Sequence, residues 1–307
     1  LYPDLAVSIS LGSLRPAGPC GPHVLGNIVK LFRCFLALLC LAVPASAGVH
    51  PSMPGAMDDL RKLCASETHA GRLAALKTML FARNVPYVVE KVRPRTAFVI
   101  PQPPDGRNVL VTVGKGPRDI VISAHYDAVT LGDGSLSRGA VDNGAAVVTL
   151  VRVAQTLRTM KLNSRVRILF TDKEEAGGLG ARRFASAHQK EPIMAAIVLD
   201  VVSSGSAVYF CPSGPSPEPA VRQPLKWGSD ERLGKMVEDV CGEQNLAHIR
   251  SKALGYTDQR SFWDYGLPSV WIAVLPEAKA HQLWLADNAK SAGLAPGLGD
   301  LSIIGAH

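Results

Sequence analysis

Apolar runs and stretches of helical periodicity alternate along most of this chain. Apolar positions spaced three or four apart predict helices over residues 65–84, 144–160, 180–189 and 231–244. Runs rich in Val, Ile and Phe predict strands over residues 86–92, 96–100, 108–113, 119–125, 165–171, 195–202, 207–211 and 268–274. Because buried strands alternate with helices, we expect an α/β fold of a single domain. Its central sheet is expected to be doubly wound and mostly parallel, with helices on both faces.

Histidine and acidic residues stand where these strands end. In a doubly wound sheet, ligands gather beyond the carboxyl ends of the strands, so such residues are candidates for a site. Residues two apart at a strand end face the same way, which places His125 beside Asp127. The full candidate set is His125, Asp127, Asp142, Glu174, Glu175 and Asp200.

Most members of this set have a simpler explanation when taken alone. Asp142 could cap the helix that follows it, and Glu174 with Glu175 could complement a helix dipole. Asp200, which lies within the apolar run 195–202, could face solvent from an edge strand. Together, however, they would crowd several carboxylates and a histidine into one buried cleft, which is unfavourable without a cation. Nitrogen and oxygen ligands of this kind suit zinc.

Four motifs taken together resemble the co-catalytic dizinc aminopeptidase family. They are His125-x-Asp127, Asp142-Asn143-Gly144, Glu174-Glu175 and Asp200, and the likeness runs from about Ala65 to the end of the chain. The family also includes plasma glutamate carboxypeptidases, glutaminyl cyclases and the non-catalytic transferrin-receptor ectodomain. The segment "YTDQRSFWDYGLPSV" is similar to the family's Ser/Thr-Asp-His-x-x-Phe…Gly-x-Pro pattern, with Gln259 where histidine is common.

The resemblance implies a set of ligands for two zinc ions per chain. Asp142 would bridge both ions, His125 and Asp200 would complete one site, and Glu175 would bind the other ion.

The family's fifth ligand is a histidine near the C-terminus, typically in His-Thr-x-x-Asp-Thr. His281 is followed by "QLWLADN", which does not match, and His307 is the last residue. We favour His307 over His281 and expect the natural protein to continue beyond it. His281 can also be explained as an ordinary residue of a helix in "EAKAHQLWLADNAK".

The resemblance also implies how catalysis would proceed. Glu174 would be the general base that takes a proton from a water shared by the two ions. Asp127 would accept the remaining N–H of His125, the one that does not face the metal. Tyr256 is a candidate for stabilising the oxyanion. The Pro-rich segment Pro212–Pro224 is either one wall of the substrate pocket or a rigid connector. The implied protein is a metallo-aminopeptidase that hydrolyses N-terminal residues from peptides.

Two alternatives keep this fold but change the function. A glutaminyl cyclase uses one zinc ion and releases ammonia from N-terminal glutamine, whereas an intact set of His125, Asp142, Glu175 and Asp200 favours two metals and hydrolysis. A metal-free binding ectodomain is the second alternative, and the retention of Glu174 argues against it. A serine hydrolase is not supported, because the chain has no Gly-x-Ser-x-Gly motif.

Composition and charge limit the classes of partner. The 307 residues are 47% hydrophobic and 19% charged, which is ordinary for a globular protein, and the formal net charge is +7. The basic residues are scattered rather than gathered in a run, so nucleic-acid binding is not supported. The expected partner is therefore a peptide substrate, and nothing in the sequence indicates an oligomeric state.

The N-terminal part has the features of a secretory signal peptide over residues 29–47. Lys30 and Arg33 lead into an apolar stretch over 34–43, and Ala45-Ser46-Ala47 supplies an A-x-A end. We expect cleavage after Ala47, a secreted or periplasmic location, and no stable membrane insertion, because about ten apolar residues are too few to span a bilayer.

The other boundaries follow from this signal peptide. We interpret residues 1–28 as a non-native upstream leader, with translation beginning near Val29, because they show no sustained periodicity. The catalytic domain would then span 48–307, truncated at its C-terminus. Its cysteines, Cys64, Cys211 and Cys241, lack the C-x-x-C spacing of a zinc site. The sequence alone does not decide whether Cys211 and Cys241 form a disulfide.

Overall fold

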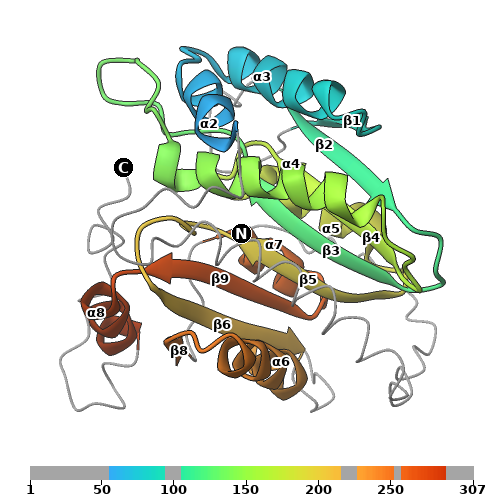
Figure 1. Ribbon diagram of the computed structural model, residues 1–307, viewed down its shortest axis with the longest axis vertical. Coiled ribbons are helices and arrows are strands. Elements are labelled where there is room, and N and C mark those ends of the chain that lie inside the picture. Colours follow the sequence, from blue (N-terminus) through green and yellow to red (C-terminus); the bar gives the residue numbers. More distant parts are fainter. Residues whose placement is uncertain (1–54, 94–104, 216–226, 252–256, 288–307) are drawn as a thin grey trace, which may run out of the picture.

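The computed structural model describes residues 55–93, 105–215, 227–251 and 257–287. Nine strands of this part of the chain form one sheet, with helices packed on both of its faces (Figure 1). The strands are β1 (Val88–Val92), β2 (Gly106–Val113), β3 (Asp119–His125), β4 (Arg165–Thr171), β5 (Ile193–Leu199), β6 (Ala207–Pro215), β7 (Trp227–Gly228), β8 (His248–Arg250) and β9 (Ser269–Leu275). The helices are α2 (Ala56–Cys64), α3 (His69–Ala82), α4 (Ala145–Leu157), α5 (Leu179–His188), α6 (Glu231–Glu243), α7 (Asp258–Asp264) and α8 (Glu277–Asp287).

The strand order places β3 at the centre of a parallel group. The sheet runs β1-β2-β4-β3-β5-β9-β6-β7, and β8 pairs with β6. Strands β4, β3, β5 and β9 are parallel neighbours, whereas β1–β2, β2–β4 and β6–β9 pair in antiparallel fashion. Because β4 and β5 lie on opposite sides of β3, the connections that leave the carboxyl ends of these strands diverge. In α/β proteins, ligands bind beyond the carboxyl ends of the strands at a point of this kind.

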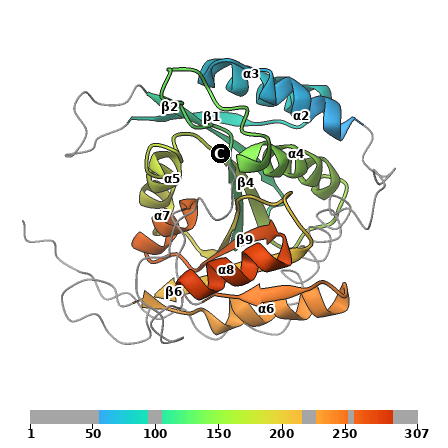
Figure 2. The same cartoon turned by 90° about the vertical axis from the view of Figure 1, so that its left-hand side faces the viewer.

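Two apolar cores cover the two faces of the sheet. Side chains of a parallel strand alternate between the faces, so Ile120 and Ile122 enter one core while Val121 enters the other. The first core contains residues from α2, α3, α4 and α6, and the second contains residues from α5, α7 and α8. Figure 2 shows α5 and α7 on one side of the central strands and α4 on the other. All seven residues of β3 are buried, which explains its continuous apolar run.

An ion cluster lies at the amino ends of the central strands. Asp119, which is fully buried, pairs with Arg165 at 2.6 Å and with Arg167 at 2.7 Å. Glu191, just before β5, also pairs with both arginines, and His188 on α5 contacts its carboxylate at 2.5 Å. The buried charge of Asp119 is thereby compensated within the chain, as burial of a carboxylate requires.

The predicted fold class is confirmed. The bounds of β3 and β4 agree with the predicted strands 119–125 and 165–171. The parallel character, however, is confined to the central strands and the β6–β8 pair. The predicted strand 96–100 lies outside the described residues, as do the leader and signal segments.

Several helices and strands begin or end at other residues than predicted. The helix expected over 65–84 begins at His69, because Thr68 caps it by accepting a hydrogen bond from the Gly71 amide. A separate helix, α2, precedes it. Strand β5 ends at Leu199, so Asp200 lies just beyond the strand and not within it. The elements α2, α7, β7 and β8 were not predicted.

The described part of the chain contains neither a disulfide nor a helix that could span a membrane. None of the three cysteines described there forms a disulfide. In the same residues, no helix combines enough length and hydropathy to cross a bilayer.

Candidate metal centre

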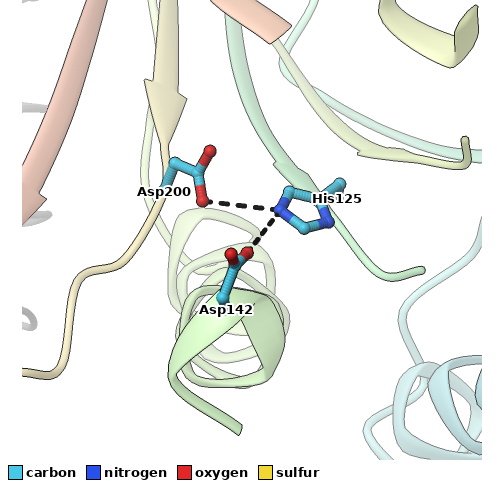
Figure 3. Close-up of side chains that lie close together, drawn as sticks. All are labelled: His125, Asp142 and Asp200. Atoms are coloured by element: carbon cyan, nitrogen blue, oxygen red, sulfur yellow. Dashed lines mark ion pairs between the residues drawn. The ribbon is translucent and has the colours of Figure 1, made fainter. Parts of the chain in front are cut away.

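The centre of the site is a buried imidazole surrounded by carboxylates. His125 is the last residue of β3, and only 2% of its surface is exposed. Its Nε2 atom lies 2.9 Å from Asp142 Oδ1 and 3.4 Å from Asp200 Oδ1, as Figure 3 shows. Its Nδ1 atom lies 3.4 Å from Asp127 Oδ1. Three carboxylates from three separate segments therefore converge on one histidine at the carboxyl end of the sheet.

Asp142 is held in this position by the turn Ala140–Gly144, which leads into α4. The side-chain amide of Asn143 donates a hydrogen bond to the Leu199 carbonyl at 2.7 Å, which ties the turn to the end of β5 beside Asp200. Gly144 packs so closely that a Cβ atom there would lie 2.7 Å from the Gly139 oxygen and 2.9 Å from a Leu60 methyl carbon. Only glycine fits at this position. The Asp142–Asn143 peptide bond is cis.

Glu174 and Glu175 follow β4 and are positioned through their backbone. Their amide groups donate to the two oxygens of Asp127, each at 3.2 Å. The Glu174 carbonyl accepts hydrogen bonds from the amides of Gly177 and Gly178, both at 2.8 Å. These two glycines have φ angles of 97° and 68°, a region that side chains rarely enter, so they allow the tight turn into α5.

Asp127 has a larger role than the sequence predicts. Besides supporting His125, its single carboxylate fixes the backbone of both glutamates. Only 1% of Asp127 is exposed, so its carboxylate makes these contacts from a buried position.

The electrostatics of the site are unfavourable for the chain alone. Burial raises the pKa of Glu175 to about 8, with Asp142 and Asp127 adding to the rise and His125 opposing it. Burial and the neighbouring Asp142 likewise raise the pKa of Asp200. Burial disfavours a charged imidazole, but the carboxylates around His125 outweigh this effect and hold its pKa well above the ordinary value. A nearby divalent cation would offset the repulsion among these carboxylates.

The residues present fit a metal. Ligand atoms of His125, Asp142 and Asp200 all lie within 4.8 Å of one another, and those of His125, Glu174 and Glu175 form a second such group. Both ring nitrogens of His125, Oε1 of Glu175 and Oδ1 of Asp200 are buried without a hydrogen-bond partner. Buried polar atoms are normally satisfied, so unsatisfied donor atoms gathered at one point suit a bound cation.

Asp258 is a further buried carboxylate that interacts electrostatically with His125, Asp127 and Asp200, although the sequence analysis did not single it out. It is the first residue of α7, is 1% exposed, and accepts a hydrogen bond from the Thr171 hydroxyl at the end of β4. Burial raises its pKa to about 7, with His125 opposing and with Asp127 and Asp200 adding to the rise. The signal that could have found it was its place in the "TDQ" segment, directly before Gln259.

Gln259 has a structural role. Its side-chain amide donates to the Cys211 carbonyl at 2.6 Å, to the Ser213 hydroxyl at 2.9 Å and to the Ser269 carbonyl at 3.3 Å. These bonds join α7 to β6 and β9, which helps to place Asp258.

The remaining candidates are not brought into the centre. His281 lies on α8 with 60% of its side chain exposed and contacts Glu277 at 3.9 Å. His307 and Tyr256 lie outside the described residues, as does most of the segment Pro212–Pro224. The choice of a fifth ligand therefore stays a prediction.

The fold and the site together are those of an α/β protein with a candidate metal centre of one histidine and several carboxylates beyond its parallel strands. Residues 108–291 match the model of peptidase family M28, and the chain belongs to this family. This match confirms the family that the sequence motifs indicated.

Two curated relatives are similar over part of their length. The probable leucine aminopeptidase 2 of Aspergillus oryzae is 27% identical over 165 residues, which are 52% of this chain and 32% of the relative. The alkaline phosphatase isozyme conversion protein of Escherichia coli is 31% identical over 123 residues, which are 36% of this chain and 35% of the relative. These matches span about a third of the length of each relative.

Solved structures share the fold. A Zn-dependent exopeptidase from Parabacteroides distasonis has a TM-score of 0.55 and 17% identity, covering 73% of this chain and 84% of its own. A Bacteroides thetaiotaomicron glutaminyl cyclase bound to N-acetylhistamine has a TM-score of 0.53 and 15% identity, covering 82% and 94% respectively.

Proposed function

We propose that this chain is a zinc-dependent exopeptidase, an aminopeptidase that removes N-terminal residues from peptides. The observation that carries this proposal is the buried group of His125, Asp142 and Asp200, with Glu174 and Glu175 beside it. Membership of peptidase family M28 supports hydrolysis of peptides. The name of the Aspergillus oryzae relative supports aminopeptidase activity, and the fold shared with the Zn-dependent exopeptidase of Parabacteroides distasonis supports zinc.

The proposed ligands for two zinc ions are His125, Asp142, Glu175 and Asp200, with His307 as the fifth. When bound, zinc acts as a Lewis acid that polarises a carbonyl group and lowers the pKa of water. The four described ligands come from the ends of three parallel strands and from one turn, so the sheet holds them in fixed relative positions.

The chain's own residues would move the proton. Glu174 takes a proton from the attacking water on its carboxylate and delivers it to the leaving amine. One oxygen of Asp127 accepts a hydrogen bond from the Glu174 amide and the other accepts one from the Glu175 amide. Asp127 would thereby hold the backbone of both glutamates in place. The two adjacent glutamates thus have separate roles.

The test is hydrolysis of aminoacyl-anilides by the wild type and by Glu174→Gln, with zinc counted in both. Loss of a general base is expected to lower kcat by about 10²- to 10⁴-fold while zinc content stays the same. Glu277→Gln, a change at an exposed glutamate of α8, is the matched control and is expected to behave as wild type. Wild-type turnover in Glu174→Gln with zinc bound would remove Glu174 from this role.

A second candidate function is that of a glutaminyl cyclase. The observation that favours it is the fold shared with the Bacteroides thetaiotaomicron cyclase over most of both chains. Zinc per chain, together with turnover of Leu-initiated and Gln-initiated peptides, separates the two functions. A cyclase would act on glutamine alone with one zinc ion. Unchanged peptide binding by a zinc-free preparation, without turnover, would instead support a binding ectodomain.

We also propose that the protein is exported and that its signal peptide is removed after Ala47. The support is the sequence pattern of residues 29–47. N-terminal sequencing of the mature protein should begin at Gly48. Sequencing of the precursor tests the expected start of translation near Val29, because recovery of residues before Val29 would refute it.

A further inference from the structure

A buried arginine on α3 contacts the backbone next to two of the segments that carry candidate metal ligands, the end of β3 and the turn that contains Asp142. Arg72 is fully buried. Its Nε atom donates to the Tyr126 carbonyl at 2.5 Å, Nη1 donates to the Arg138 carbonyl at 2.9 Å, and Nη2 donates to the Gly139 carbonyl at 3.3 Å. One guanidinium group therefore joins the beginning and the end of the segment 126–139.

Both ends of this segment adjoin the candidate site. Tyr126 lies between His125 and Asp127, so its carbonyl is part of the backbone that carries both side chains. The Gly139 carbonyl also accepts the Gly144 amide at 2.9 Å, which closes the turn that contains Asp142. Fixing these carbonyls relative to one another fixes the approach of His125 to Asp142.

The fit at Gly139 indicates how closely the parts are packed. Its φ angle is 52°, and a Cβ atom there would lie 2.8 Å from the Asp142 oxygen, 2.9 Å from Ala128 Cβ and 3.2 Å from Arg72 Nη2. The guanidinium group, the Gly139 backbone and the Asp142 backbone thus pack directly against one another. Arginine suits this task because its planar group presents several donors in a fixed geometry, whereas a lysine ammonium is a point donor on a flexible stem.

We propose that Arg72 is a positioning residue of the metal centre: it holds the two ends of the segment 126–139 so that His125, Asp127 and Asp142 are prearranged for zinc. Arg72 precedes the residues that match the family, 108–291, so helix α3 would complete a site that the family region carries. The proposal rests on the proposed zinc function for its readout of metal binding. Its structural part, the restraint of the segment, is independent of zinc.

The chain offers a matched control for the loss of a buried arginine. Arg152 on α4 is 9% exposed and pairs with Asp59 at 3.0 Å, and neither residue belongs to the candidate site. The variants Arg72→Met, Arg72→Lys and Arg152→Met are made in the full chain and compared at a temperature at which circular dichroism shows each to be folded.

Zinc affinity is measured by competition with a chelator, and ligand geometry by the visible absorption of the Co²⁺-loaded protein. Arg72→Met is expected to weaken zinc binding by about 10- to 100-fold, as loss of residues that orient metal ligands does. It should also alter the Co²⁺ spectrum and lower kcat more than it changes KM. Arg72→Lys should weaken binding less. Arg152→Met should lower stability but leave zinc affinity and the Co²⁺ spectrum unchanged.

Hydrogen exchange of the metal-free proteins tests the restraint itself. Amides of residues 127–139 should exchange faster in Arg72→Met than in the wild type, and at the wild-type rate in Arg152→Met. Wild-type zinc affinity, Co²⁺ spectrum and exchange in Arg72→Met would overturn the proposal. If Arg72→Met does not fold, Arg72→Lys decides by the same three measurements. Failure of the wild type to bind zinc would refute the proposed function, and the exchange rates would still decide the role of Arg72.

Discussion

Asp127 offers a sharp test of how the two glutamates are held. Its carboxylate accepts from the amides of Glu174 and Glu175, each at 3.2 Å, and lies 3.4 Å from His125 Nδ1. Asp127→Asn keeps the shape of the side chain but leaves one acceptor oxygen, and its NH2 group would face a backbone N–H.

The magnitude follows from these contacts. One buried backbone N–H would lose its partner, which is unfavourable by about 1–3 kcal/mol. Because about 1.4 kcal/mol corresponds to a factor of ten in an equilibrium constant, zinc affinity should fall by about 5- to 150-fold if the whole loss falls on metal binding. Removing one negative charge from a crowded acidic site reduces repulsion in the metal-free protein. Asp127→Asn should therefore reduce the free energy of unfolding of the metal-free protein by less than it weakens the free energy of zinc binding.

Three measurements test this prediction: zinc affinity by chelator competition, urea unfolding without metal, and hydrogen exchange at the amides of Glu174 and Glu175. Exchange at one of these amides should accelerate. Asp239→Asn is the control, because it alters an exposed carboxylate that pairs with Lys235 on α6 and should leave zinc affinity unchanged. Wild-type zinc affinity combined with wild-type exchange in Asp127→Asn would refute the reasoning.

Three further predictions concern other parts of the chain. Asp119→Ala leaves Arg167 with only Glu191 as its ion-pair partner among the described residues, and should lower the free energy of unfolding in urea by about 3 kcal/mol. Burial raises the pKa of Glu191, but His188 and Arg167 lower it more. The ionised Glu191 carboxylate therefore stabilises the fold above its unfolded pKa, and this stabilisation is lost as the pH falls through its folded pKa. In urea unfolding, Glu191→Gln should be less stable than the wild type at neutral pH and equally stable in acid. His281→Ala should leave zinc affinity unchanged in chelator competition, because this side chain is exposed; weaker binding would revive it as the fifth ligand.

The sequence predicted the central strands well because their burial is nearly complete. Nearly every residue of β3 and β4 is buried, and most of them are apolar, so the boundaries of these strands are visible in the residues themselves. Strand β8 has three residues and lies off the main strand order, and it leaves little pattern to detect. The antiparallel placement of β2 beside β4 is set by tertiary pairing, which local periodicity does not report.

The candidate ligands could be proposed from the sequence because parallel strands bring their carboxyl ends to one edge. Arg72 could not, and Asp258 could have been noticed only by its place in the "TDQ" segment, because the contacts of both depend on partners far along the chain. Asp258 reaches Thr171 from α7, and Arg72 reaches Tyr126 and Gly139 from α3. An isolated arginine within an amphipathic helix gives no sign that three carbonyl groups will surround it.

The central strands are charged at both ends, and the two ends are balanced differently. At the amino ends, Asp119 is neutralised by arginines of the same chain. At the carboxyl ends, several carboxylates share one histidine among the described residues, and a bound cation would balance their charge. The residues that stabilise the amino ends of these strands are therefore separate from those of the candidate metal centre. Substitutions that strengthen the ion cluster around Asp119 are expected to raise thermal tolerance without altering the candidate metal centre, which gives directed evolution of this protein a defined region to explore first.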